Sequence, residues 1–184
     1  RGTHEIGGSC IEIQNKDTRI IIDIGIPLNV AEIDSDDILP KVEGLYSSTF
    51  PQKKVNAIFI SHSHLDHYGL LGNISKEIHI FIGEASKDLI EISNLFMKDK
   101  CSINNYQILK AENPILIGSI KVTPFLIDHS AFDSYCFFIE ADGKKILYTG
   151  DFRNHGRKGK LTDKITGRLS KHIDAVIIEG TNMK

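Results

Sequence analysis

The chain has 184 residues, of which 41% are hydrophobic, so it is long enough to bury a sizeable core. A formal net charge of -2 excludes a global basic field for nucleic acid, so local patches must provide any such contact. Three separated cysteines favour a reducing cytoplasm over a disulfide framework or a cysteine zinc site. Neither a signal peptide nor a bilayer-spanning stretch is recognisable, and we expect a cytoplasmic protein that does not contact membranes.

The first third of the chain predicts a β-hairpin and a long connector. Cys10–Ile13 alternates like a strand, Asn15–Asp17 forms a turn, and Arg19–Ile24 returns as a second strand. Consecutive isoleucines in the second strand indicate burial on both faces. Residues 27–54 predict a loop with a short helix over residues 38–46. This loop is either one wall of an active-site mouth or a solvated connector.

Strand and helix patterns alternate along the rest of the chain. Asp142-Gly143 is a strong signal for a two-residue hairpin. The order of the patterns fits two sheets covered by helices. The expected strands are Val55–Ile60, Glu77–Ile82, Leu116–Ile120, Lys121–Ile127, Tyr135–Ala141, Lys144–Thr149 and a buried Asp174–Glu179, and the expected helices are Glu84–Lys98, Leu161–Leu169 and a run that opens at Tyr68–Gly72.

Three of the eight histidines fall within six residues, His62, His64 and His67, and Asp66 stands among them. They directly follow the apolar strand Val55–Ile60, so a rigid element positions a loop whose side chains can converge. Imidazole nitrogens suit zinc, iron and other first-row ions, and a carboxylate adds negative charge for a second ion. We therefore predict a metal site here, against the alternative of a polar loop that is rich in histidine.

The stretch His62-Ser63-His64-Leu65-Asp66-His67 resembles the His-x-His-x-Asp-His signature of the metallo-β-lactamase superfamily. Three other positions, one before this stretch and two after it, resemble further motifs of that family, and they stand in the family's order along the chain. Asp23 ends an apolar strand like the first motif, His129 stands in a segment like the third, and Asp151 in one like the fourth. The family's fifth motif is a histidine, and we find no counterpart for it in this sequence.

This resemblance implies an α/β fold, the αββα four-layer sandwich, with residues 1–184 as its N-terminal part. It also implies two zinc ions, although the sequence alone shows only the local cluster. Asp23 is expected to support the histidine loop without binding metal, while Asp66, His129 and Asp151 would serve catalysis. The implied ligands are His62, His64 and His129 for the first ion, Asp66 and His67 for the second, and Asp151 between them.

The segments Asp128–Tyr135, Tyr148–Arg153 and Val176–Thr181 resemble the ribonuclease J and β-CASP branch of the family. In that branch a strand like the last of these precedes an inserted β-CASP domain. We therefore expect residues 1–184 to be one metallo-β-lactamase-like domain that lacks the insertion, the remaining strands and the last metal histidine. Uncovered sheet surface would then favour association of copies into a homo-oligomer.

A basic stretch, residues 153–160, directly follows the expected bridging aspartate. Its Arg153 and Arg157 are candidate contacts for substrate phosphate, as is the hydroxyl of Ser130. Two plainer alternatives remain, a solvated charge run for the basic stretch and a turn-capping role for the serine.

The function that the resemblance implies is zinc-dependent hydrolysis of phosphodiesters, with RNA as the expected substrate. Two ions about 3.5–4 Å apart can activate water and stabilise an attacked phosphoryl group, so no nucleophilic serine or cysteine is needed. One alternative is a glyoxalase II-type hydrolase of small esters or thioesters. Another is a non-catalytic metal-binding or interaction domain. A flavodiiron-like electron-transfer protein is disfavoured, because its second motif position is usually glutamate and here it is His64.

Overall fold

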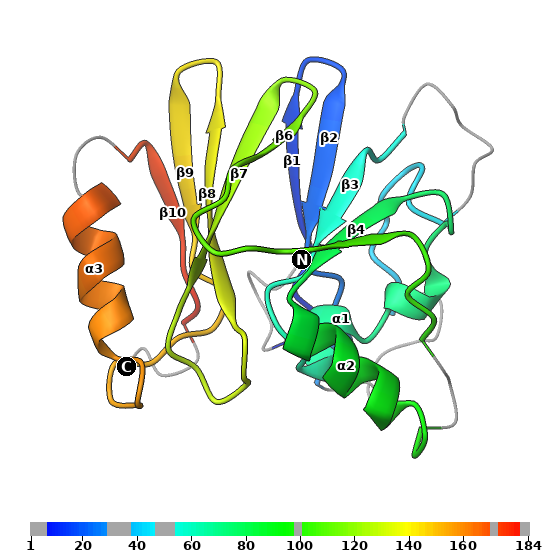
Figure 1. The fold of residues 1–184 in the computed structure, drawn as a ribbon. Coiled ribbons are helices and arrows are strands. Elements are labelled where there is room, and N and C mark those ends of the chain that lie inside the picture. The colour runs from blue at the N-terminus through cyan, green and yellow to red at the C-terminus, as the bar shows by residue number, and fades with distance from the viewer. Residues whose placement is uncertain (1–6, 29–37, 47–53, 98–100, 170–172, 181–184) are drawn as a thin grey trace.

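The computed structural model describes residues 7–28, 38–46, 54–97, 101–169 and 173–180, and these residues form two mixed sheets (Figure 1). The first sheet has the order β1-β2-β3-β4-β5. Its first pair is antiparallel and the other neighbours are parallel. Its strands are β1 (Ile11–Asn15), β2 (Thr18–Ile22), β3 (Ala57–Phe59), β4 (His79–Ile82) and β5 (Tyr106–Ile108).

The second sheet has the order β10-β9-β8-β7-β6. Its neighbours are antiparallel except for the parallel pair of β10 and β9. The hairpin between β8 and β9 turns at Asp142-Gly143 as predicted, where both residues have positive φ. The strands are β6 (Ile115–Ile117), β7 (Ile120–Leu126), β8 (Tyr135–Ala141), β9 (Lys144–Tyr148) and β10 (Ala175–Ile177).

Helices cover the outer face of each sheet, and the result is the expected αββα sandwich (Figure 1). On the first sheet lie α1 (Leu65–Tyr68), the 3-10 turn η4 (Leu71–Asn73) and α2 (Glu84–Ser93). On the second sheet lies α3 (Lys160–Leu169). The two helix-bearing faces and the space between the sheets are the three places where apolar side chains are buried.

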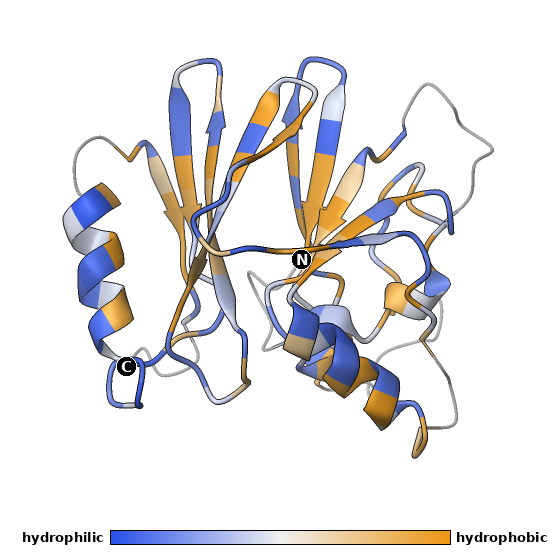
Figure 2. Cartoon of the chain, in the orientation of Figure 1, coloured by the Kyte–Doolittle hydropathy of each residue, from blue (hydrophilic) through white to orange (hydrophobic). Residues whose placement is uncertain are grey.

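The three isoleucines of β2 show how the layers are assembled. Ile20 and Ile22 pack between the sheets, whereas Ile21 points to the helical side, and all three are fully buried. This burial on both faces confirms what the consecutive isoleucines predicted. Between the sheets the rings of Phe59 and Phe81 stack with centroids 4.6 Å apart, and orange strand segments meet there in Figure 2.

The structure differs from the sequence predictions in the connector and at some element ends. No helix forms over residues 38–46, because Pro40 cannot donate a backbone hydrogen bond and Gly44 takes a left-handed φ of 77°. The first helix begins at Leu65, inside the histidine motif and before Tyr68. Strand β5 was not predicted, since its residues are largely exposed and lack an apolar alternation.

Two further predictions concern where helix α2 ends and whether the last strand is buried. Helix α2 ends at Ser93, and the side chain of Asn94 then bonds the backbone of Cys101. Lys98, the predicted helix end, lies outside the described residues. The prediction of a buried last strand is wrong, because β10 is an edge strand and Val176 is 52% exposed.

The polar residues of interest all follow strand ends at one end of the sandwich. Asp23 follows β2 and His62 comes shortly after β3, two strands that pair in register with Ile22 beside Phe59. His129 follows β7 and Asp151 follows β9, both from the second sheet. Each sheet therefore contributes part of one polar cluster.

Candidate metal centre

The first half of the cluster comes from the loop between β3 and α1. The His62 side chain is fully buried, and its Nδ1 lies 2.9 Å from the hydroxyl oxygen of Ser61. That contact orients the ring so that its Nε2 points outward, 3.1 Å from Nδ1 of His64. The two histidines thus present one nitrogen each to the same small space.

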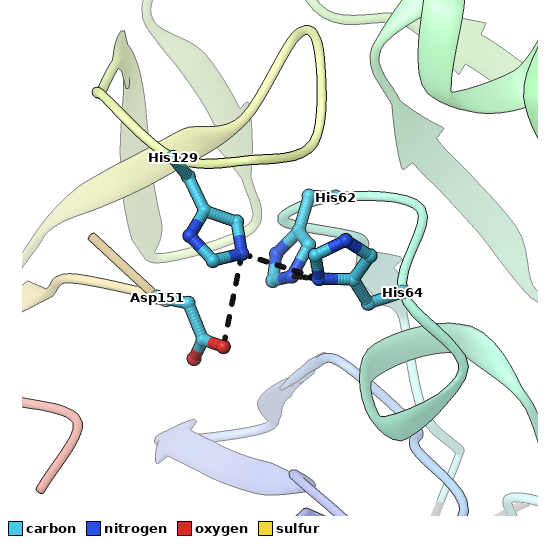
Figure 3. Close-up of side chains that lie close together, drawn as sticks. All are labelled: His62, His64, His129 and Asp151. Atoms are coloured by element: carbon cyan, nitrogen blue, oxygen red, sulfur yellow. Dashed lines mark hydrogen bonds and ion pairs between the residues drawn. The ribbon is translucent and has the colours of Figure 1, made fainter. Parts of the chain in front are cut away.

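His129 reaches this space from the loop after β7 in the second sheet. Its Nε2 lies 3.2 Å from Nδ1 of His64, and Figure 3 shows the three imidazoles turned toward one another. A tetrahedral zinc ion with zinc–nitrogen distances of about 2.0–2.1 Å would hold its nitrogens about 3.3 Å apart. The observed spacings fit three ligands of one such ion.

Asp151, from the loop after β9, lies between this group and a second one. Its Oδ2 is 3.9 Å from Nε2 of His129, and its Oδ1 is 3.2 Å from Nε2 of His67 (Figure 3 shows the first contact). Asp66 Oδ2 lies 3.8 Å from the same nitrogen of His67. Within each group the candidate ligand atoms lie no more than 4.8 Å apart. The groups are His62, His64, His129 and Asp151, and then Asp66, His67 and Asp151.

Asp23 is buried behind the second group and accepts four hydrogen bonds. Its Oδ1 accepts the Ser61 amide at 2.7 Å. Its Oδ2 accepts the Ser61 hydroxyl at 2.8 Å, Nδ1 of His67 at 2.8 Å and the Tyr148 hydroxyl at 2.6 Å. A carboxylate on the far nitrogen of a ligand histidine fixes its tautomer and orientation. Asp23 thus contacts Ser61 and His67 from outside both candidate ligand groups, and its supporting role stays a prediction.

Protonation of the cluster favours metal binding by the first group. Burial lowers the pKa of His62 and that of His129, so both rings are neutral near pH 7 and keep a lone pair. Burial would also lower the pKa of His67, but Asp23 and Asp151 outweigh it and raise that pKa to about 10. An ion bound at the second group would replace this proton as the positive charge between the carboxylates.

The loop that carries the candidate ligands Asp66 and His67 is held by the chain that follows β2. The amide of Ile24 donates to the carbonyl of His67 at 2.7 Å, and that of Ile26 donates to the carbonyl of Leu65 at 3.0 Å. Gly25 lies between them, and a Cβ built on it would fall 1.6 Å from the carbonyl oxygen of Asp66. Only glycine permits this approach of two backbones.

We expect Gly25→Ala to displace the loop bearing Asp66 and His67, and to lower the free energy of unfolding by about 1–3 kcal/mol or more. Urea unfolding and metal titration would measure the two effects. Gly167→Ala is a matched control, because a Cβ there meets nothing within 4 Å and alanine favours helix α3. Equal stability and metal affinity in both variants would contradict the close approach.

The candidate phosphate contacts follow His129 and Asp151 in the chain and differ in their exposure. Arg153 Nε lies 3.7 Å from Oδ1 of Asp128 and makes no hydrogen bond within the described residues. Arg157 and Ser130 are exposed. His79, at the start of β4, contacts Asn105 at 2.8 Å and belongs to neither candidate ligand group.

Three residues of the site were not assigned a role from the sequence. Ser61 and Tyr148 both bond Asp23, and Asp128 accepts the backbone amides of Gly156 and Lys158 at 2.7 and 3.4 Å. Polar residues in or beside apolar strands were the available signal, since a buried polar group needs a partner. Nothing in the sequence identified which partner each would meet.

The geometry agrees with comparisons to known proteins. Residues 5–181 match the model of the family described as the metallo-beta-lactamase superfamily. The chain belongs to this superfamily. The match spans both ligand groups and both sheets, so the family membership rests on the same residues as the site.

Curated relatives in this superfamily include nucleases. The chain is 30% identical to an RNase J-like protein of Methanocaldococcus jannaschii over 98% of this chain and 41% of the relative. It is 29% identical to ribonuclease J 2 of Streptococcus pyogenes over 88% of this chain and 30% of the relative. The chain therefore spans less than half of the length of these relatives, and the resemblance to the ribonuclease J branch is confirmed over that span.

A solved structure shows the same fold. A protein of unknown function from Enterococcus faecalis superimposes with a TM-score of 0.85 over 97% of this chain and 48% of that chain, at 23% identity. Among the residues that the structure describes, none of the helices has the length and apolar character needed to cross a bilayer.

Proposed function

We propose that this chain is the metal-binding part of a zinc-dependent phosphodiesterase that acts on RNA. The observation that carries the proposal is that two adjacent groups of candidate ligands, one of four residues and one of three, share Asp151. Two adjacent ions suit displacement at phosphorus, because they stabilise both the attacking and the leaving oxygen. The names of the ribonuclease relatives support the same reaction.

Each residue of the cluster has a defined part in this proposal. His62, His64 and His129 would hold one ion through nitrogens that already converge. Asp66 and His67 would hold the other, and the two oxygens of Asp151 face the two groups separately. Zinc, when bound, would supply an activated water molecule and neutralise charge on the phosphoryl oxygens.

Residues outside the ligand set would bind the substrate. The basic loop after Asp151 is folded around the buried carboxylate of Asp128, directly before His129. The Arg153 side chain is partly exposed beside Asp128, and its guanidinium group is a candidate for a phosphate oxygen. Arg157 and Ser130 remain candidates on the exposed rim.

We also propose that residues 1–184 correspond to the first part of a β-CASP-type nuclease. Alignment with less than half of each ribonuclease relative supports this assignment. The alternative of a glyoxalase II-type ester or thioester hydrolase uses the same kind of metal site. Substrate, not metal content, therefore separates the two functions.

We expect the zinc-loaded chain to cleave single-stranded RNA faster than acyl-glutathione, and to lose this activity in EDTA. Both substrates would be tested at the same zinc concentration, with product detected by gel and by thiol release. Turnover of acyl-glutathione without cleavage of RNA would favour the glyoxalase-type alternative. Metal binding without turnover of either substrate would favour a non-catalytic domain.

A further inference from the structure

The loop after His129 presents an exposed aromatic ring beside the candidate metal centre. Phe132 is 65% exposed, although it lies between the buried residues Ala131 and Ser134. It is three positions after His129 in the chain, so their Cα atoms lie within about 11 Å of each other. An exposed aromatic side chain at this distance from a reaction centre is available to a substrate.

The exposure of Phe132 comes from a well-anchored loop. The carboxylate of Asp133 accepts the amide of Ala85 at the start of α2, at 3.1 Å, and the hydroxyl of Ser134 donates to the carbonyl of Ala131 at 2.9 Å. Asp133 has a left-handed φ of 63°. These contacts hold the backbone on both sides of Phe132, so its ring projects from a fixed position.

A cation from the loop after Asp151 lies over the ring of Phe132. Lys158 Nζ is 4.6 Å from the centroid of Phe132. The amides of Lys158 and Gly156 both donate to the carboxylate of Asp128, which is buried next to His129. The loop that follows His129 and the loop that follows Asp151 therefore contact each other a second time, through the ring of Phe132 and the ammonium group of Lys158.

We propose that Phe132 and Lys158 form a subsite for one unpaired nucleotide beside the cleaved bond, in which the base stacks on Phe132 and Lys158 contacts a phosphate. Stacking on aromatic rings next to basic groups is the usual way that proteins bind single strands without reading sequence. This inference rests on the proposed function and deepens it, because it selects single-stranded nucleic acid over a duplex.

Binding would be measured by fluorescence anisotropy with an eight-nucleotide single-stranded RNA and an abasic strand of equal length. Phe132→Ala is expected to weaken RNA binding by about 5- to 100-fold, to leave abasic-strand binding unchanged, and to be rescued by Phe132→Trp. Phe96→Ala is the matched control, since Phe96 is 86% exposed after helix α2, outside the site. It should bind both strands like the wild type.

Lys158→Gln should weaken the binding of both the RNA and the abasic strand. It should also reduce the slope of log affinity against log salt concentration by about 0.7, the value for one lost phosphate contact. RNA binding that is equal to abasic-strand binding in the wild type, or unchanged in Phe132→Ala, would overturn the subsite. If RNA is cleaved but Phe132 has no effect, the proposed function stands alone. If Phe132-dependent binding occurs without any cleavage, the subsite stands and the proposed function fails.

Discussion

Asp151→Ala is expected to lower phosphodiester hydrolysis by at least about 100-fold and to reduce the zinc content of the chain. Asp151 is the residue shared by both ligand groups, with one oxygen toward His67 and the other toward His129. Loss of a residue that merely orients a ligand already costs about 10- to 100-fold in affinity or activity. Removal of a shared ligand should cost more, because it weakens both sites at once.

Two further variants serve as comparisons for Asp151→Ala. Asp66→Ala removes a member of the second group alone, so it should lower the zinc content chiefly at that site. Asp88→Ala removes an exposed carboxylate from α2 and should change neither zinc nor turnover. Zinc would be measured by mass spectrometry and turnover on RNA. Full activity of Asp151→Ala at unchanged zinc content would refute the two-ion site.

Asp23→Ala is expected to lower the free energy of unfolding of the metal-free chain by about 3–5 kcal/mol. The substitution removes the acceptor for Ser61, His67 and Tyr148, all in a fully buried site. It removes one of the two carboxylates, Asp23 and Asp151, that raise the pKa of His67 to about 10, so a buried charge loses part of its compensation. The second site should also bind metal about 10- to 100-fold more weakly.

Graded variants separate the contributions to this effect. Tyr148→Phe deletes one donor and should cost about 1 kcal/mol. Asp23→Asn tolerates the left-handed φ of 59° and keeps one acceptor oxygen, so it should fall between the two. Urea unfolding gives the stabilities and zinc titration gives the affinities. If the urea unfolding curve of Asp23→Ala matched that of Asp88→Ala, the supporting role of Asp23 would be contradicted.

The sequence by itself determined the elements and the local half of the site. Apolar runs and turn residues predicted the strands β7, β8 and β9 nearly to the residue, because period-two alternation and Asp142-Gly143 act within a few positions. The spacing of His62, His64 and His67 after an apolar strand was enough to predict a ligand loop. The failures lay where local signals conflict, as at Pro40, or where burial depends on neighbours, as in β10.

Only the tertiary structure decided which distant residues meet. The approach of His129 to His64 and the contact of Lys158 with Phe132 each join segments that follow different strands, and the bond from Tyr148 to Asp23 joins the end of β9 to the residue after β2. No local pattern encodes such contacts, because side-chain periodicity describes the faces of one element at a time. Pairing of the strands and packing of the two sheets across their apolar layer bring these strand ends together, and that packing places the candidate ligands.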